Sequence, residues 1–356
     1  MLCKRVQVYD KQCQMGEIVV NPNVQEEKKN SGRLHGRLAK MAESEHAALL
    51  LALLVLVVVM SFLSPYFFTQ HNIMNVLRQV SLQAIVAIGI TMIILSGEID
   101  LSIGSSQGLV GVIALMVLNA TDSLFMAFLA AIALGVFIGL INGLLVTKGK
   151  INSLIGTLGM MTIIRGAAMV ITSAKAVQTP LKSFKVIGTG YWGPFPIPVI
   201  ITVVLALLFY FILHHTTFGR YIYAVGGNGE AAKLSGLPVG RIKLTSYVLC
   251  GALTALSAYI LASRMNSGQP NAGVGFEMEV IGAVILGGIS LTGGVGSLIG
   301  ALIGILILGV LSNGLILLNV SSFWQDIARG AVIILAVYLD TYRRGKQQQK
   351  LVQATK

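Results

Sequence analysis

Charged residues are scarce in this sequence of 356 residues. Only 11% are Asp, Glu, Lys or Arg, against about 25% in a typical soluble domain. A soluble protein of this length would need more charge to cover its surface, yet 55% of the residues are hydrophobic. The shortage of charge excludes a soluble enzyme, a disordered chain and a disulfide-rich secreted module. It leaves a membrane protein with several spanning segments.

Other signatures are also missing. Cysteine occurs three times, at Cys3, Cys13 and Cys250, with no CxxC pair, which favours reduced structural cysteines over a redox or metal site. Aromatic residues make up 7%, and the apolar runs are long, so helices are favoured over a β-barrel. The sequence has no G-x-x-x-x-G-K-[ST], H-E-x-x-H or G-x-S-x-G motif. We therefore expect no P-loop ATP site, no catalytic residues and no metal site.

Ten segments are apolar over a length close to what a bilayer crossing needs, about 20 residues. They are residues 46–64, 75–95, 101–119, 123–147, 152–173, 196–213, 245–264, 279–292, 296–318 and 320–340. We predict an all-α fold: a polytopic transmembrane helical bundle of about ten membrane segments, some short or broken. Eight or nine spans are the alternatives.

The charged residues indicate how the chain is divided and oriented. Residues 1–45 hold eight Lys/Arg and six Asp/Glu, and we predict a cytoplasmic, disordered N-terminal extension there. A transmembrane domain over 46–342 and a basic cytoplasmic tail over 343–356 follow. The basic joint 214–244 and the tail place both termini in the cytoplasm by the positive-inside rule. The lysines of joint 174–195 disagree with this orientation.

Two acids interrupt apolar segments at residues 96–104, which read SGEIDLSIG. A buried carboxylate is costly, so Glu98 and Asp100 should face a cavity or find a partner. Gly97 and Gly104 allow a broken helix whose free backbone groups line such a cavity. Acids there could bind a cation or hydrogen-bond a polyol. The other interpretation is a solvated cytoplasmic turn.

A second interruption is predicted at residues 268–296. Glu277 and Glu279 stand where a helix begins, a position that favours acids. Glycine pairs at 287–288 and 293–294 then indicate another broken helix.

Small and polar residues recur inside the apolar segments. Asn142 and Asn313 are polar residues in apolar segments and can hydrogen-bond a polar solute or another helix. Glycines repeat at intervals of four, which allows close helix packing or a sliding surface. The glycines concerned are Gly135, Gly139 and Gly143 in one segment, and Gly296, Gly300 and Gly304 in another.

The joint at residues 216–243 is long, amphipathic and mixed in charge. Glu230, Ala231 and Ala232 form a short helical core, and Gly236 provides a stop signal four residues after Ala232. A short helix held along the membrane surface is suited to contact a soluble partner. The alternative is an idle connecting loop.

The chain resembles the permease subunits of ribose-type ABC importers, over about residues 46–342. The resemblance rests on an ordered series of segments rather than on one motif. They are SGEIDLSIG, GLINGLLV (139–146), TLGMMTIIRG (157–166), residues 214–243, residues 268–304 and NGLILLNVSSFWQ (313–325). Two departures are Glu98, where a small residue is usual, and Met278-Glu279-Val280, where a run like L-D-A is common.

The resemblance implies a transport subunit that is not itself an enzyme. It would move a monosaccharide, ribose or a related pentose or hexose, across the bacterial inner membrane by alternating access. A periplasmic binding protein, a cytoplasmic ATPase that carries ATP and Mg²⁺ (possibly two fused ATPase domains), and a second permease copy or a sister permease would be its partners. An ion-coupled secondary transporter of a small polar solute is the alternative, based on Glu98 and Asp100.

The resemblance also assigns residues. The expected contact with the ATPase consists of Arg220, Gly227, Asn228, Glu230, Ala231, Ala232, Lys233 and Gly236. The expected translocation path includes Glu98, Asp100, Ser102, Asn142 and Asn313.

Overall fold

The computed structural model describes residues 45–335 and 338. It divides into residues 1–47 and 48–356, and the account below concerns the second unit. The predicted N-terminal extension, apart from Glu45, and the predicted basic tail lie outside the described residues.

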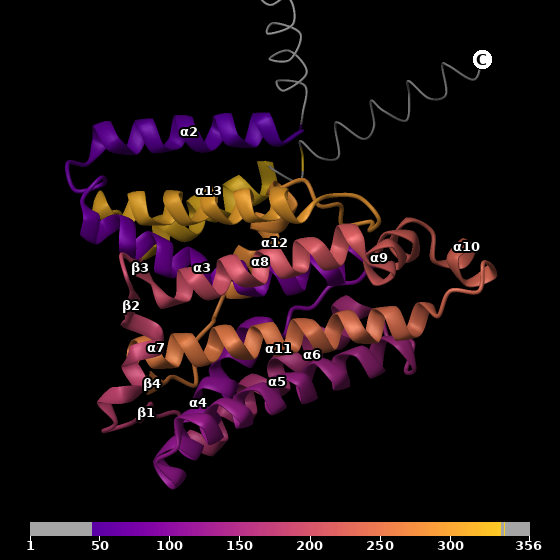
Figure 1. Ribbon diagram of the computed structural model, residues 1–356, viewed down its shortest axis with the longest axis horizontal. Helices are drawn as coiled ribbons and strands as arrows, with labels where there is room; N and C mark the ends of the chain where they lie inside the picture. The colour runs from indigo at the N-terminus through magenta and orange to yellow at the C-terminus, as the bar shows by residue number, and fades with distance from the viewer. Residues whose placement is uncertain (1–44, 336–337, 339–356) are drawn as a thin grey trace, which may run out of the picture. The chain divides into compact units, whose positions relative to one another are not determined.

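Long helices make up most of the described chain (Figure 1). Eight of those in the described residues are long and apolar enough to cross a membrane. They are α2 (Glu45–Leu63), α3 (Gln70–Leu95), α4 (Ile103–Thr121), α5 (Leu124–Thr147), α6 (Ser153–Thr172), α8 (Ile197–His215), α11 (Val239–Met265) and α13 (Leu298–Leu317). The predicted all-α bundle is confirmed.

The two remaining segments of the ten predicted from the sequence are helical but shorter than a bilayer crossing needs. Residues 322–335 form one, and α12 (Phe276–Leu286) forms the other. The predicted spanning helix at 279–292 is wrong in its bounds, because α12 begins earlier and ends at the first glycine pair. Gly288, Gly293 and Gly294 adopt positive φ angles of 90°, 84° and 71°, which a helix cannot contain. The predicted break at these glycines is confirmed.

Short elements gather where the long helices end. One end, here the α9–α10 end, comprises residues 96–102, 148–152, 216–238 and 287–297, and includes α9 (Thr217–Gly227) and α10 (Gly229–Leu234). The opposite α7 end includes α7 (Lys185–Thr189) and the 3-10 helix η1 (Lys182–Phe184). Its two antiparallel strand pairs are β1 (Val177–Gln178) with β4 (Ser267–Gly268), and β2 (Tyr191–Trp192) with β3 (Phe195–Pro196).

Polar side chains mark where many of the helices begin. Each accepts a hydrogen bond from a backbone N–H in the first turn, which would otherwise be unsatisfied. Such caps matter in a membrane protein because lipid supplies no replacement partner. The capping residues are Thr69 for α3, Ser123 for α5, Asn152 for α6, Thr216 for α9, Asn228 for α10 and Ser297 for α13.

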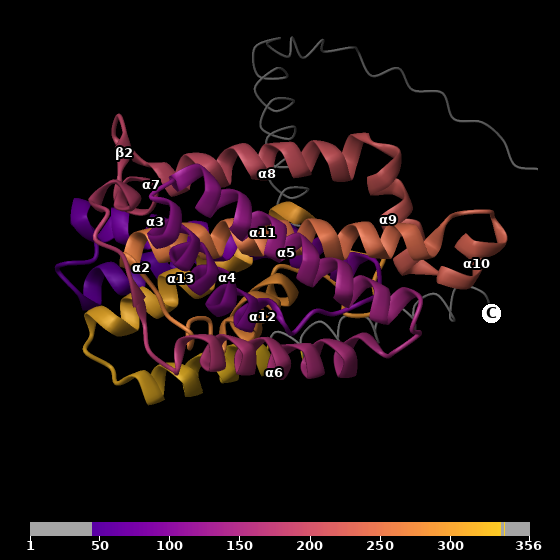
Figure 2. The same cartoon turned by 90° about the horizontal axis from the view of Figure 1, so that it is seen from below.

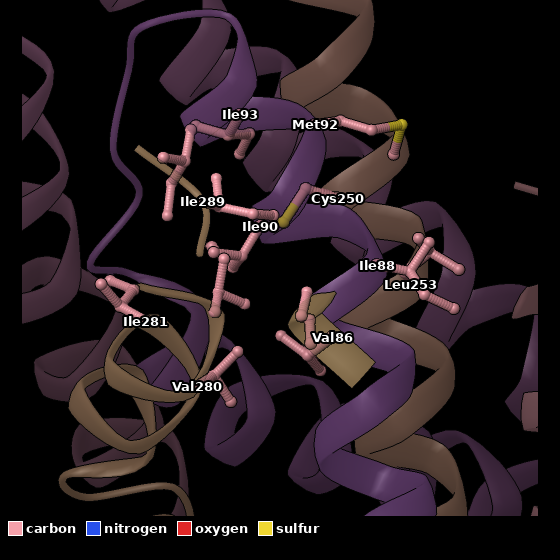
Figure 3. Close-up of a cluster of buried hydrophobic side chains, with 14 of the residues drawn as sticks. Val86, Ile88, Ile90, Met92, Ile93, Cys250, Leu253, Val280, Ile281 and Ile289 are labelled. Carbon is pink, nitrogen blue, oxygen red and sulfur yellow. The ribbon is translucent and has the colours of Figure 1, made fainter. Parts of the chain in front are cut away.

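The main hydrophobic core surrounds α3. Figure 3 shows Val86, Ile90 and Ile93 of α3 beside Val280 of α12 and Cys250 of α11. These side chains are buried. By contrast α6 and α8, which lie on opposite sides of the bundle in Figure 2, bury only 22% and 17% of their most apolar stretch.

The four-residue glycine repeats lie where helices approach most closely. A Cβ on Gly139 would lie 2.4 Å from the carbonyl oxygen of Tyr247 in α11. A Cβ on Gly304 would lie 2.0 Å from the carbonyl oxygen of Ala283 in α12. Both distances are far inside van der Waals contact, so the repeats pack α5 on α11 and α13 on α12.

Candidate functional site

Three of the predicted path residues form one buried cluster near the α9–α10 end. Asp100 is 3% exposed and Asn142 is completely buried. The carboxylate of Asp100 accepts hydrogen bonds from the Ser102 backbone N–H (2.8 Å), the Ser102 hydroxyl (2.7 Å) and the Asn142 amide (3.2 Å). Burial raises the pKa of Asp100, and these hydrogen bonds act in the opposite direction.

Glu98 lies outside this cluster, in an ion pair. Its Oε1 is 2.5 Å from the Nζ of Lys243 near the start of α11. The hydroxyl of Tyr247, one turn further along α11, donates to the carbonyl oxygen of Ile99 at 2.9 Å. Residues 96–102 are therefore fastened to α11 at two points.

Asn313 lies at the other end of the bundle, apart from the remaining predicted path residues. Its side-chain amide and that of Asn72 in α3 donate to each other at 2.8 and 3.0 Å. Both residues are buried. This reciprocal pair joins α13 to α3, so Asn313 serves helix contact in this structure.

A cavity of about 260 Å³, open on one side, lies between four of the helices. Helices α3, α4, α11 and α12 line it together with the chain just before α12. The lining residues are Gln79, Leu82, Gln83, Gln107, Leu261, Arg264, Gly273, Val274, Phe276 and Glu279.

Three of the cavity's polar side chains, Gln83, Gln107 and Glu279, are held by hydrogen bonds or an ion pair. The Gln83 Nε2 donates to Glu279 Oε2 at 2.9 Å, and the other carboxylate oxygen of Glu279 pairs with Arg329. The Gln107 Nε2 donates to the Ser257 hydroxyl at 3.0 Å. The Oε1 of Gln83 is buried and has no hydrogen-bond partner in the described structure.

The sequence reasoning missed Gln83 and Gln107 and treated Glu279 only as a helix-terminal acid. A signal was available, because Gln79 and Gln83 stand four residues apart in an otherwise apolar helix. Such a pair shares one helix face.

The predicted contact with a soluble partner lies on α9, α10 and the turn after them (Figure 1). Asn228 caps α10 by accepting from the Ala231 N–H at 2.9 Å. Seven of the eight predicted residues are exposed, namely Arg220, Gly227, Asn228, Glu230, Ala231, Lys233 and Gly236. Ala232 is the exception: it is buried in the main core, so it anchors α10 and cannot belong to an exposed contact.

Two further features shape this surface. Leu234, at the end of α10, is 88% exposed. A second cavity of about 260 Å³ lies beside α9, lined by residues that include Thr217, Tyr221 and Arg241. An exposed apolar side chain and an open hollow are each suited to contact another protein.

Close backbone contacts connect α9 to the two interrupted segments. The Gly294 N–H donates to the Leu95 carbonyl oxygen at 2.9 Å. A Cβ on Gly226 would lie 1.8 Å from that same oxygen. The Tyr223 hydroxyl donates to the Gly296 carbonyl oxygen at 3.0 Å, and burial raises its pKa. A displacement of α9 would therefore reach both segments.

Spanning helices joined by interrupted segments are typical of multi-pass membrane transport proteins. Comparison with known families agrees, since residues 72–337 match the model described as "Branched-chain amino acid transport system / permease component". The chain belongs to this family of transport permeases. It is accordingly a transport subunit rather than an enzyme in itself.

Several curated relatives are similar over nearly their whole length. The ribose import permease of Escherichia coli (strain K12) is 45% identical, covering 88% of this chain and 98% of that protein. The ribose import permease of Bacillus subtilis (strain 168) is 45% identical, covering 82% and 91%. The L-arabinose ABC transporter permease of Azospirillum brasilense is 40% identical, covering 85% and 89%. No solved structure matches. The predicted resemblance to ribose-type importer permeases is confirmed.

Proposed function

We propose that this chain is the membrane subunit of an ABC importer that carries a monosaccharide, ribose or a related sugar, across the bacterial inner membrane. Its similarity to ribose and arabinose permeases supports the class of substrate. The observation that carries the mechanism is the exposed α9–α10 surface, joined through Gly226 and Tyr223 to both interrupted segments.

A separate ATPase subunit, which would hold ATP and Mg²⁺, is the proposed partner of this surface. Movement of α9 would be passed to the Leu95 and Gly294 backbone, and so to residues 96–102 and 287–297 near the Asp100 cluster. Transport is coupled only if the ATPase prefers one conformation of this surface over the other.

The distribution of charge supports a cytoplasmic α9–α10 end. Positively charged residues favour the cytoplasmic side of a membrane protein. Lys148, Lys150, Arg220, Lys233, Arg241 and Lys243 lie at or beside this end, against Arg78, Lys175, Lys182, Lys185 and Arg264 at or beside the α7 end. With this orientation the α7 end receives sugar from a periplasmic binding protein. A second permease copy or a sister permease would complete the pore.

The ion-coupled alternative loses its motivation in this structure. Glu98 is already paired with Lys243, and Asp100 accepts hydrogen bonds from Ser102 and Asn142. Neither carboxylate is left open to a cation.

Substitution on the α9–α10 surface tests the proposal. We expect the double variant Glu230→Arg/Gly236→Arg to lower the amount of co-purified ATPase at least about tenfold, or about 1.4 kcal/mol of binding. ATP-dependent sugar uptake should fall with it. Both positions are exposed, and a Cβ on Gly236 meets no atom within 4 Å. The φ of 82° at Gly236 strains any side chain there, so the control needs a glycine with the same strain.

A matched control exists at the opposite end. Asp122 and Gly193 are likewise an exposed acid and an exposed positive-φ glycine, so Asp122→Arg/Gly193→Arg should retain the ATPase. Full ATPase binding and uptake in the α9–α10 variant would refute the docking assignment. A wild-type permease that transports sugar on an ion gradient without any ATPase would refute the proposed function.

A further inference from the structure

A buried carboxylate without a partner lies at the start of α12. Glu277 is 9% exposed, and its Oε2 has no hydrogen-bond partner among the residues that the structure describes. A carboxylate withdrawn from water is costly unless a cation or hydrogen-bond donors compensate it. At this oxygen the cost is left uncompensated.

The guanidinium of Arg165, in α6, is engaged with neutral groups instead. Its Nη1 donates to the carbonyl oxygens of Pro270 at 3.0 Å and Ala272 at 2.7 Å, both in the segment just before α12. Within the described residues Arg165 forms no ion pair. Hydrogen bonds between two ionised groups are stronger than those to a neutral carbonyl, so a stronger partner than the present two is available in Glu277.

Two glycines of α4 bring the arginine and the carboxylate close together. A Cβ on Gly104 would overlap the Oε2 of Glu277, and a Cβ on Gly108 would lie 3.2 Å from the Nη1 of Arg165. The two glycines stand four residues apart, which is about 6 Å along one face of the helix. Arg165 and Glu277 already interact electrostatically across this distance. Neither glycine has a side chain that would stand between them.

We propose that Arg165 positions the segment before α12 in two alternating ways. In the conformation described here its guanidinium bonds Pro270 and Ala272, and in a second conformation of the transport cycle it pairs with Glu277. The exchange needs a displacement of no more than about one helical turn, part of which the arginine side chain itself can cover. This inference rests on the proposed function, because it takes an ATP-driven change of conformation as given.

Helix α6 is connected to the α9–α10 end, where that change would begin. The Ser153 hydroxyl accepts a hydrogen bond from the Ile99 N–H at 3.3 Å. The Thr157 hydroxyl accepts one from the Leu101 N–H at 3.0 Å. Both donors belong to residues 96–102, which approach α9. Since α6 buries only 22% of its most apolar stretch, these bonds and those of Arg165 are a large share of what holds it.

Each of the two positions has an advantage that the other lacks. The present one satisfies two backbone carbonyls and leaves Glu277 unpaired. The other would form an ion pair and release the two carbonyls. Such a balance keeps two conformations close in free energy, so a partner that prefers one of them can shift the population.

Cross-linking tests whether the two side chains approach each other. The permease–ATPase complex would carry Arg165→Cys/Glu277→Cys, with Cys3, Cys13 and Cys250 replaced by alanine, and would be treated with a short bifunctional thiol reagent. We expect the cross-linked fraction to differ at least about fivefold between samples with and without a non-hydrolysable ATP analogue. Asn72→Cys/Asn313→Cys, at the fixed contact of α3 with α13, should cross-link equally in both.

Charge variants test whether the pairing matters for transport. Glu277→Gln keeps the size of the side chain and should lower ATP-driven uptake at least about tenfold, while the complex still retains its ATPase. Arg165→Lys keeps the positive charge and should transport better than Arg165→Gln. The double variant Arg165→Gln/Glu277→Gln should be no worse than the poorer single variant. Met278→Gln places the same amide at the next position, which is 55% exposed, and should leave uptake unchanged.

Four results would each overturn the inference: equal cross-linking with and without the analogue, normal uptake in Glu277→Gln, additive losses in the double variant, or no gain of Arg165→Lys over Arg165→Gln. All four leave the importer function standing, because the wild-type complex would still transport sugar with ATP. A wild-type permease that retains no ATPase would overturn the importer function itself.

Discussion

Helices α2 and α3 are consecutive in the chain, and both could cross a membrane, but they contrast in burial. The most apolar stretch of α2 is 6% buried and has a mean hydropathy of 2.8, whereas that of α3 is 83% buried with a value of 1.7. The more hydrophobic helix is thus the more exposed one. Lipid requires an apolar side chain at every outward position, while a buried helix can carry polar groups if neighbours satisfy them.

The polar residues of α3 show what this burial provides. Asn72 pairs with Asn313, Gln83 bonds Glu279, and the carbonyl oxygen of Leu95 receives the N–H of Gly294. Helix α2 contributes to a small apolar cluster, in which its Met60 lies with Phe67 and with Val310 of α13. Stability should therefore depend strongly on α3 and weakly on α2.

The largest effect is expected for Gly89→Val in α3. A Cβ at Gly89 would lie 2.8 Å from the Cα of Cys250 in α11, and backbone cannot yield as a flexible side chain can. Overpacking of this kind costs about 3 kcal/mol. Unfolding by SDS titration would measure the loss. Ala52→Val also adds bulk, but on the exposed side of α2, and should hardly change the stability. Equal losses of stability in the two variants would contradict the predicted difference between α3 and α2.

An intermediate effect is expected for Asn313→Leu. The change removes one partner of the buried Asn72–Asn313 pair and leaves polar atoms of Asn72 unsatisfied, at a cost of about 1–3 kcal/mol. The Nδ2 of Asn72 would still donate a hydrogen bond to the Phe67 carbonyl oxygen, at 2.9 Å. The double variant Asn72→Leu/Asn313→Leu should lose less than the sum of the two single losses in the same titration. Strict additivity would show that the pair does not couple α3 to α13.

The smallest effect is expected for Leu51→Ala in α2. Leu51 is 63% exposed, so its truncation opens no cavity inside the protein. We expect a loss below about 0.5 kcal/mol for the purified permease in detergent. A loss as large as that of Asn313→Leu would mean that α2 packs against protein rather than lipid.

The sequence was sufficient to predict much of the fold. Spanning helices were predicted to within a few residues because apolar length is a property of each segment alone. The glycine break after α12 and the exposed α9–α10 surface were also predictable, since both depend on local residue types. The burial of Ala232 was not predicted, because it depends on α10 packing against the core, which the local sequence does not specify.

The interior contacts required the structure. Asp100, Ser102 and Asn142 do meet, and their role in the translocation path stays a prediction. Asn313 was grouped with them by residue type, although it ends up at the opposite end of the bundle beside Asn72. Gln83 and Glu279 are 196 positions apart, and no periodicity relates them. Which helix faces meet is decided by packing, so the cavity could not be predicted from spacing.

The shortness of α12 has a consequence for how the protein is made. With 11 residues it measures about 16 Å, roughly half of the hydrocarbon core, and its first turn carries Glu277 and Glu279. The translocon releases a segment into lipid when that segment is hydrophobic enough, and α12 alone has too little hydrophobicity for release. Helix α13 and residues 322–335 hold α12 in the bundle. Gly304 of α13 packs on Ala283, and Arg329 forms an ion pair with Glu279. The place of α12 in the bilayer therefore depends on partners synthesised after it as well as on α3, which precedes it.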